Sequence, residues 1–323
     1  MLRTLFLIVK SARPRQWIKN LALYAALVFS GFFFYDPPDA VPYFVTVTVA
    51  FGVFCLLTSS IYLINDLEDF DADRHHPFKR KRPIASGELA KPIAQSMAVI
   101  GLIAALVSSL WLPGFFKLLV LSYFILQVLY TKYLKHIPIL DVASIASGFL
   151  IRVYAGAVVV NLHMSVWFLL TVISASLFLA VGKRQSERTL LLGQDGLGKD
   201  SADLGSTRKI LKRYSQRLLD QYTGMFANAT WLTYALYAFQ DEGNKTATRF
   251  AGFFAVLPRT LHSQKLLMLS VPFVIFGVMR YLQLVYESNQ GESPEKVLLQ
   301  DKPLLTTVFL FGSVVMVVIY LLS

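Results

Sequence analysis

Long apolar runs recur from one end of the chain to the other, and they constrain the fold more than any other feature. Because a run of about 20 apolar residues crosses a bilayer as a helix, we expect one all-α polytopic membrane domain over residues 1–323. The chain is 55% hydrophobic, against roughly 45–50% in soluble domains. The nine predicted transmembrane helices cover residues 17–34, 43–64, 92–112, 115–133, 138–160, 165–182, 220–239, 266–286 and 304–322.

Positive charge is distributed unevenly between the ends of these runs. The formal net charge is +11. With the N-terminus inside, Lys and Arg gather in the inner segments, the outer segments near 36–42, 113 and 161–164 are almost bare, and only 241–265 departs from this pattern. Because cytoplasmic loops collect Lys and Arg, we expect a cytoplasmic N-terminus and an outer C-terminus. Topology then explains most of the charge, so no nucleic-acid partner is expected.

An acidic motif follows the second run, at a membrane end where basic residues are usual. Asp66, Asp69 and Asp73 are spaced i, i+3, i+7, and Asn65 precedes them. On a continued helix this spacing places three carboxylates on one face, where they repel unless a cation lies among them. Mg²⁺ prefers oxygen ligands and bridges carboxylates to substrate phosphates. We therefore predict a magnesium site, with a solvated acidic loop as the alternative.

Basic and polar residues at other inner ends are candidates for binding phosphate. Lys79 and Arg82 follow the aspartates in the predicted loop 65–91, Tyr130 and Lys135 end the fourth run, and the predicted loop 183–219 opens with Lys183 and Arg184. Each cation has a second interpretation, as a topology signal or a contact to anionic lipid.

Arg152 lies about 11 residues into the fifth run, roughly 16 Å deep at 1.5 Å per residue. An intramembrane arginine is costly and normally faces an interior partner. We expect that partner to be an anionic substrate, or else a carboxylate such as Asp141 or one of the motif. Gly148 and Gly156 lie on the same helical face and leave room for a substrate or a close helix.

At these residues the chain resembles the UbiA superfamily of intramembrane prenyltransferases. Its NDxxDxxxD motif after the second helix is matched by Asn65, Asp66, Asp69 and Asp73. The resemblance implies nine transmembrane helices around a central cavity open to the cytoplasm. Most members carry a second aspartate-rich motif after the sixth helix. This chain has the basic Gly182-Lys183-Arg184-x-x-Glu187 there, which argues against ordinary aromatic prenylation.

With this basic motif, the chain resembles one branch of that superfamily, the decaprenyl-phosphate phosphoribosyltransferases. The branch pattern RPxQWxKN is matched at residues 13–20, LKH at 134–136, GFxxRxxAG at 148–156, GKRxxE at 182–187 and a late GxxPE at 291–295 with Asp301 following. The branch implies a Mg²⁺-dependent transfer, with Mn²⁺ possible in its place, of 5-phosphoribose from phosphoribosyl diphosphate (PRPP) to a polyprenyl phosphate. It also implies a bacterial plasma membrane and a product used for cell-wall arabinan.

The resemblance and the residues together give a predicted site. The metal ligands are Asn65, Asp66, Asp69 and Asp73, and the three aspartates are catalytic. The predicted substrate-binding residues are Lys19, Asn65, Lys79, Arg82, Tyr130, Lys135, Arg152, Lys183, Arg184, Glu187 and Tyr214. Membrane lipids are expected partners and a homo-oligomer is left open. The alternatives are an aromatic prenyltransferase using a prenyl diphosphate, and a transporter of phosphorylated lipids or ions.

Overall fold

The computed structural model describes residues 2–38, 40–75, 79–195, 214–240, 265–287 and 294–322, and these residues are helical without a strand. They divide into two compact units. Unit 1 comprises Met1–Ala25, Tyr35–Leu162 and Gly193–Tyr214, and unit 2 comprises Ala26–Phe34, His163–Leu192 and Ser215–Ser323. The short helix α2 (Tyr24–Phe29) crosses the boundary between them.

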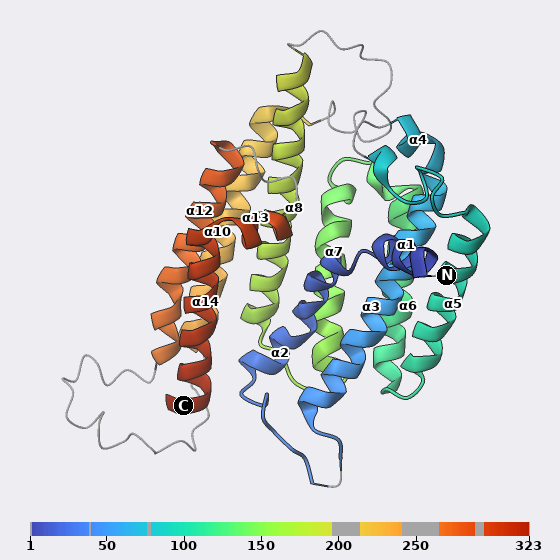
Figure 1. The fold of residues 1–323 in the computed structure, drawn as a ribbon. Coiled ribbons are helices and arrows are strands. Elements are labelled where there is room, and N and C mark those ends of the chain that lie inside the picture. Colours follow the sequence, from blue (N-terminus) through green and yellow to red (C-terminus); the bar gives the residue numbers. More distant parts are fainter. Residues whose placement is uncertain are drawn as a thin grey trace, which may run out of the picture. The chain divides into compact units, whose positions relative to one another are not determined.

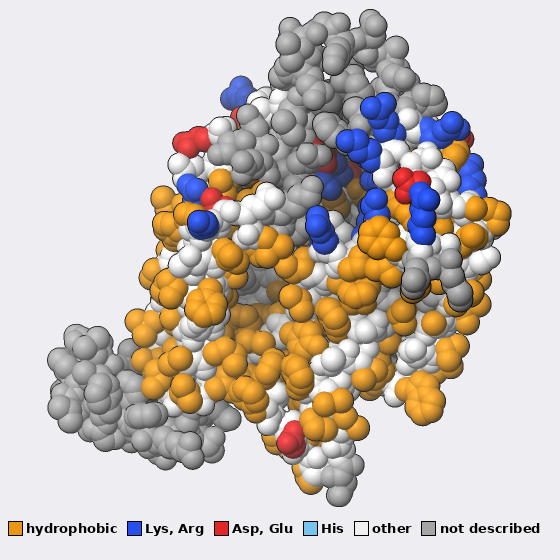
Figure 2. All heavy atoms as spheres, viewed as in Figure 1, with side chains coloured by type: hydrophobic (Ala, Val, Ile, Leu, Met, Phe, Trp, Pro, Cys, Tyr) orange, Lys and Arg blue, Asp and Glu red, His pale blue; other side chains and the backbone are white. Residues whose placement is uncertain are grey.

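Unit 1 holds four long helices that run side by side, with α1 lying crosswise against α3 (Figure 1). Part of its core joins α1 to α3 and α5 through Leu7, Leu63, Ala94 and Ala98. Figure 2 shows Lys and Arg side chains gathered at the end of this unit that carries α4, with apolar side chains covering the surface below. The elements are α1 (Leu2–Ala12), η1 (Pro14–Leu23), α3 (Tyr43–Glu68), α4 (Phe70–His75), η2 (Lys79–Lys81), α5 (Lys91–Ser109), α6 (Gly114–Lys132), η3 (Leu134–His136) and α7 (Leu140–Val158).

Unit 2 packs its helices around a second core. Phe178 of α8, Ala227 of α10, Tyr281 of α12 and Leu304 of α14 meet in one buried cluster. The ring of Tyr281 lies edge-on to Phe178, with centroids 5.2 Å apart. The elements are α8 (Val166–Asp195), α10 (Gln216–Gln240), η5 (Leu266–Ser270), α12 (Val271–Tyr286), α13 (Pro294–Gln300), α14 (Lys302–Val317) and the π-helical turn η6 (Val318–Leu322).

Seven helical segments among the described residues are long and apolar enough to span a membrane. They correspond to seven of the nine predicted runs, and the chain is therefore a multi-pass membrane protein. The first predicted run is instead the 3-10 helix η1 followed by the six-residue α2. The run 220–239 lies in α10, which carries Asp220, Gln221 and Asn228 and is not among the seven. Nine spans therefore stay a prediction.

Both predicted polar loops contain helical residues, which corrects their boundaries. Helix α3 continues to Glu68, and α4 and η2 follow within 65–91. Helix α8 continues past Lys183 to Asp195, and α10 begins at Gln216. The middle of the second predicted loop, residues 196–213, lies outside the described residues. The two polar motifs are thus carried mainly by helical backbone and only partly by loops.

Candidate active site

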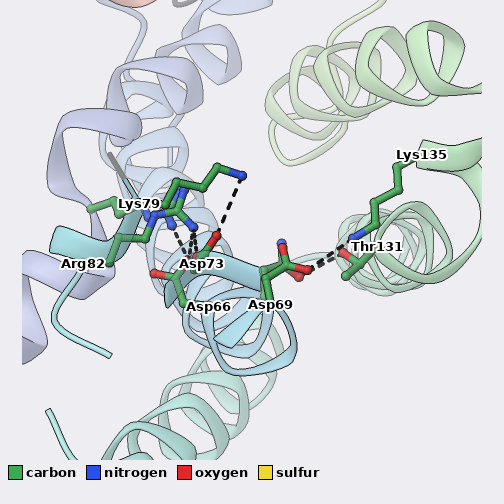
Figure 3. Close-up of polar contacts among 9 residues, drawn as sticks. Asp66, Asp69, Asp73, Lys79, Arg82, Thr131 and Lys135 are labelled. Carbon is green, nitrogen blue, oxygen red and sulfur yellow. Dashed lines mark hydrogen bonds and ion pairs between the residues drawn. The ribbon is translucent and has the colours of Figure 1, made fainter. Parts of the chain in front are cut away.

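Two buried carboxylates of the acidic motif share one guanidinium group. Arg82 Nη1 donates to Asp66 Oδ1 at 3.0 Å and to Asp73 Oδ2 at 2.5 Å (Figure 3). The side chains of Asp66 and Asp73 are 3% and 2% exposed. Lys79 Nζ lies 3.8 Å from Asp73 Oδ1 on the same side. Arg82 and Lys79, both predicted substrate contacts, therefore lie against the predicted metal ligands.

Arg13 adds a second guanidinium to Asp66, and sequence reasoning did not place it in the site. It donates to the same Oδ1 atom that Arg82 contacts. Arg13 adopts a left-handed backbone, with φ 53° and ψ 61°, where α1 turns into η1. Nearby, Ser59 donates to the carbonyl oxygen of Ala12 and accepts from Trp17 Nε1. The only sequence signal for Arg13 was its position as the first residue of the RPxQWxKN pattern.

The third aspartate is separated from the other two. Helix α3 ends at Glu68, and Asp69 lies between α3 and α4 with φ −83° and ψ 8°. Its side chain is 39% exposed, and Lys135 Nζ lies 3.5 Å from its Oδ1 (Figure 3). Asp69 therefore pairs with Lys135, whereas Asp66 and Asp73 share Arg82. The backbone bonds from Asp69 N–H to Asn65 O and from Asp73 N–H to Asp69 O continue across the break at 2.9 and 2.8 Å, so three carboxylates on one helical face stay a prediction.

Asn65 contacts α6, the helix of the fourth predicted run. Its Oδ1 accepts a hydrogen bond from Thr131 Oγ1 at 2.9 Å (Figure 3). Thr131 lies near the end of α6, and Lys135 follows in η3. The structure therefore brings together the end of α3 and the end of α6, as the sequence predicted from their shared membrane side.

The donor set suits a divalent cation of the magnesium type. Asp66 and Asp73 place two carboxylate oxygens within reach of a single nitrogen atom of Arg82. One cation can therefore contact both, and Mg²⁺ is usually bound by one or two carboxylates together with water and substrate phosphate. In the described part of the chain, no three Asp, Glu, His or Cys side chains form a group that holds a metal. A site on these residues thus rests on two carboxylates.

Two predicted substrate contacts, Tyr130 and Tyr214, hydrogen-bond to residues around the start of α7. Tyr130 donates to Oδ1 of the fully buried Asp141 at 3.2 Å. The buried Tyr214 hydroxyl accepts from the backbone N–H of Ile139 at 2.6 Å. Ile139 has φ 70°, which is rare for a β-branched residue and persists only where the surroundings hold it. Their binding of substrate stays a prediction.

Arg152 is held by neutral groups. Its side chain is 5% exposed. It donates to Asn20 Oδ1 at 2.9 Å, to the Gly148 carbonyl oxygen at 3.2 Å and to the Tyr123 hydroxyl at 2.5 Å. In the ranges that the structure covers, no carboxylate contacts Arg152, so the predicted alternative of an ion pair with Asp141 or a motif aspartate is wrong. Asn20 and Tyr123 were missed as its partners.

The basic motif of unit 2 is an ion-paired cluster on one helix. Arg184 donates to Glu187 Oε2, and Lys183 Nζ lies 3.8 Å from Glu187 Oε1. Arg184 is buried and Lys183 is partly exposed. Glu187 therefore holds both cations that were predicted to bind phosphate. Lys19, the remaining predicted contact, is half-buried in η1 of unit 1 beside Asn20.

Comparison with known proteins identifies the family. The model of the UbiA prenyltransferase family matches residues 22–187, just over half of the chain. This chain belongs to the UbiA prenyltransferase family. The match includes the aspartate motif and ends at Glu187, the last residue of the basic motif.

Curated UbiA relatives cover nearly the whole chain. The decaprenyl-phosphate phosphoribosyltransferase of Mycolicibacterium smegmatis is 38% identical over 304 residues, 92% of this chain and 87% of the relative. The protein of the same name from Corynebacterium glutamicum is 36% identical, covering 92% and 81% of the two chains. That from Mycobacterium tuberculosis is 34% identical, covering 92% and 89%.

Solved structures share the UbiA fold. A UbiA homolog from Archaeoglobus fulgidus bound to DMAPP and Mg²⁺ matches with a TM-score of 0.62 at 18% identity, covering 97% of this chain and 98% of that chain. A digeranylgeranylglyceryl phosphate synthase matches with a TM-score of 0.60 at 18% identity, covering 98% and 99%. At such identity the likeness concerns the fold alone.

Proposed function

We propose that this chain transfers the 5-phosphoribosyl group of PRPP to a polyprenyl phosphate such as decaprenyl phosphate. The C1–O bond to the diphosphate breaks, and diphosphate leaves with the bonding electrons. An oxygen of the lipid phosphate bonds to C1 from the opposite face, which inverts that carbon. The product is polyprenyl-phosphoryl-5-phosphoribose, and the whole chain acts as one transferase domain.

One observation carries this proposal: the 38% identity, over 92% of the chain, to a decaprenyl-phosphate phosphoribosyltransferase. The charges of the described residues agree with it. PRPP carries a diphosphate and a 5-phosphate, and the acceptor brings another phosphate. Such a substrate set requires more cationic groups than an aromatic acceptor does. Lys183 and Arg184 supply cations on α8, where an aromatic prenyltransferase of this family would carry its second acidic motif.

The diphosphate would be bound at the aspartate motif. Asp66 and Asp73 would hold Mg²⁺, or Mn²⁺ in its place, with Asn65 and Asp69 completing the predicted ligands. A bound Mg²⁺ would supply positive charge to the leaving diphosphate. Arg82 contacts both buried carboxylates, and this supports assigning it to diphosphate oxygens bound beside them.

The acceptor needs no general base, because the attacking phosphate oxygen is already anionic. The chain's task there is to bind and orient phosphate groups and to exclude water. Most of the candidates for phosphate contact are cationic side chains, and the predicted ribose contacts are polar. The full set is Lys19, Lys79, Arg82, Lys135, Arg152, Lys183 and Arg184 for phosphate, Glu187 and Tyr214 for ribose, and Tyr130 as a further substrate contact.

The membrane context follows from the substrates. A polyprenyl tail is soluble only in the bilayer, whereas PRPP is a cytoplasmic metabolite. We therefore place the enzyme in a bacterial plasma membrane with its site and N-terminus on the cytoplasmic side. The lipid product would supply phosphoribose to a cell-wall arabinan pathway.

The test is a transfer assay on membranes containing the expressed chain. PRPP labelled in the ribose is incubated with decaprenyl phosphate and Mg²⁺, and we expect label to enter the organic phase. A parallel reaction offers a labelled prenyl diphosphate with aromatic acceptors. Membranes with Asp66→Ala serve as the control. Transfer of the prenyl group, with no transfer of phosphoribose, would replace the proposed function by aromatic prenylation.

A further inference from the structure

In unit 2, one carboxylate oxygen collects hydrogen bonds from three helices. Asp220 Oδ1, on α10, accepts from Gln185 Nε2 of α8 at 2.8 Å and from Gln216 Nε2 at 3.3 Å. Tyr286, at the end of α12, donates its hydroxyl to the same atom at 3.0 Å. None of these four residues was singled out as a site residue from the sequence.

This arrangement fixes the orientation of both amides. A carboxylate only accepts hydrogen bonds, so each glutamine must present its nitrogen to Asp220. The carbonyl oxygens Oε1 of Gln185 and Gln216 then point elsewhere. Both are buried, and neither has a hydrogen-bond partner in the part of the chain that the structure describes. The same is true of the Ser186 hydroxyl, and the Gln185 side chain is only 1% exposed.

Buried acceptors without donors are costly, so a cluster of them indicates a ligand that brings hydrogen-bond donors. We propose that Gln185, Gln216 and Asp220 bind the vicinal hydroxyl groups of a sugar, and that this sugar is the ribose of PRPP. The inference rests on the proposed function and deepens it. Hydroxyl groups donate to neutral carbonyl oxygens, whereas a prenyl chain has no hydrogen to donate.

The neighbours of Gln185 on α8 agree with a ribose phosphate. Lys183 and Arg184 immediately precede it, and both contact Glu187. Cations that suit phosphate are therefore followed along the same helix by neutral acceptors that suit hydroxyls. A sugar phosphate carries both kinds of group within one small molecule.

The test compares PRPP with its 2-deoxy analogue, using the purified full-length protein. We expect the wild type to prefer PRPP by at least about tenfold in kcat/KM, because a site built to bind a hydroxyl rejects the analogue without it. Gln185→Met keeps the side-chain length and removes the acceptor. It should reduce the preference to within about threefold of unity. Gln283→Met is the matched control, since Gln283 is an exposed α12 residue bonded to Arg280 and Glu287, and it should keep the wild-type preference.

A binding measurement covers the case in which Gln185→Met fails to fold. Ribose 5-phosphate should raise the Tm of the wild type and of Gln283→Met, and should raise that of the half-buried Gln216→Met much less. Undiminished preference in Gln185→Met and an unchanged Tm shift in Gln216→Met would overturn the inference and leave water as the occupant. A changed Mg²⁺ requirement with the preference intact would overturn it in favour of a cation. If the wild type transfers no phosphoribose, the proposed function is refuted. The Tm shift produced by ribose 5-phosphate would then still test whether this site binds the sugar.

Discussion

Arg152 and Asn20 lie 132 residues apart in the sequence and meet through a 2.9 Å hydrogen bond from Nε to Oδ1. Asn20 also donates from Nδ2 to Thr58 Oγ1 at 3.3 Å. The guanidinium lies over the ring of Tyr123, with 4.8 Å between Arg152 Cζ and the ring centroid. A single buried amide thus connects η1 with α3 and with the arginine of α7, so Asn20 is the residue on which this polar cluster depends.

Asn20→Leu should destabilise unit 1. The substitution leaves a buried guanidinium without one of its three acceptors, which costs about 1–3 kcal/mol and more for a charged group. Thermal unfolding in detergent measures the effect. Asn228→Leu, on the exposed face of α10, is the matched control and should change stability by less than about 0.5 kcal/mol. Equal Tm values for the two variants would show that Arg152 has other partners of equal strength.

Asn substitutions at Asp66 and Asp69 should differ in their effect on stability, although we expect both to abolish activity. Asp66→Asn leaves Arg13 and Arg82 short of a buried counter-charge, at a cost of up to about 3 kcal/mol. Asp69→Asn removes only a half-exposed pair with Lys135, worth less than about 1 kcal/mol. Both variants should lose phosphoribosyl transfer at saturating Mg²⁺. Near-normal turnover by either would remove that residue from the metal site.

Chelation should abolish transfer reversibly. EDTA removes the divalent cation that we assign to Asp66 and Asp73, and added Mg²⁺ or Mn²⁺ should restore the rate. A Tm measurement gives a readout independent of activity, since a cation that binds only the folded protein raises the Tm. The Mg²⁺-dependent rise should be absent in Asp73→Asn. Full activity in EDTA would contradict the assignment.

The sequence predicted the helices correctly where a long apolar run was enough to identify a membrane span. The run predicted at 266–286 coincides with η5 and α12, and the run at 115–133 with α6 to within one residue. The first predicted run, 17–34, is not one long α-helix, because its apolar composition does not report the local backbone conformation. Pro14 begins a 3-10 helix after the left-handed Arg13, and composition does not report such a turn.

The sequence predicted only those site residues whose charge is unusual at the end of a membrane span. Asp66, Asp69 and Asp73 stood out because carboxylates are unusual there. Asp66 and Asp73 are buried against Arg82, whereas Asp69 is 39% exposed beside Lys135. The spacing of the motif does not report which cations pack against each carboxylate. Arg13 and Asn20 were likewise missed, because each acts through a partner that only tertiary packing brings near.

Asp301 should make stability depend on pH in unit 2. Its carboxylate caps α14 through the Leu304 N–H and accepts two bonds from Arg280, at 3.1 and 2.7 Å. Hydrogen bonds from Arg280 chiefly, and from the Leu304 N–H, lower the pKa of Asp301. Stability from a lowered carboxyl pKa is present above the unfolded value, about 3.9, and is lost as pH falls through the folded value.

The Asp301 variants separate the ion pair from the helix cap. Asp301→Asn should lower the Tm at pH 7, and the difference from wild type should shrink below about pH 4. Asp301→Asn keeps a capping oxygen and removes the charge, so it isolates the Arg280 pair, whereas Asp301→Ala removes the cap as well and should lower the Tm further. A Tm difference between wild type and Asp301→Asn that stays constant from pH 7 to pH 3 would contradict the lowered pKa.

Gly156 and Gly148 were predicted to leave room on the face of Arg152, and the structure gives them unequal surroundings. A Cβ at Gly156 would lie 1.8 Å from the Leu23 carbonyl oxygen, which is backbone and cannot rotate away, whereas a Cβ at Gly148 would first meet Gln127 Nε2 at 3.5 Å. Gly156→Ala should therefore push η1 from α7 and cost about 1–3 kcal/mol. Gly148→Ala should change the Tm little. Both substitutions add one methyl group to α7, so Gly148→Ala is the matched control for Gly156→Ala. Equal Tm values for the two variants would show that η1 does not approach α7 as closely as this contact requires.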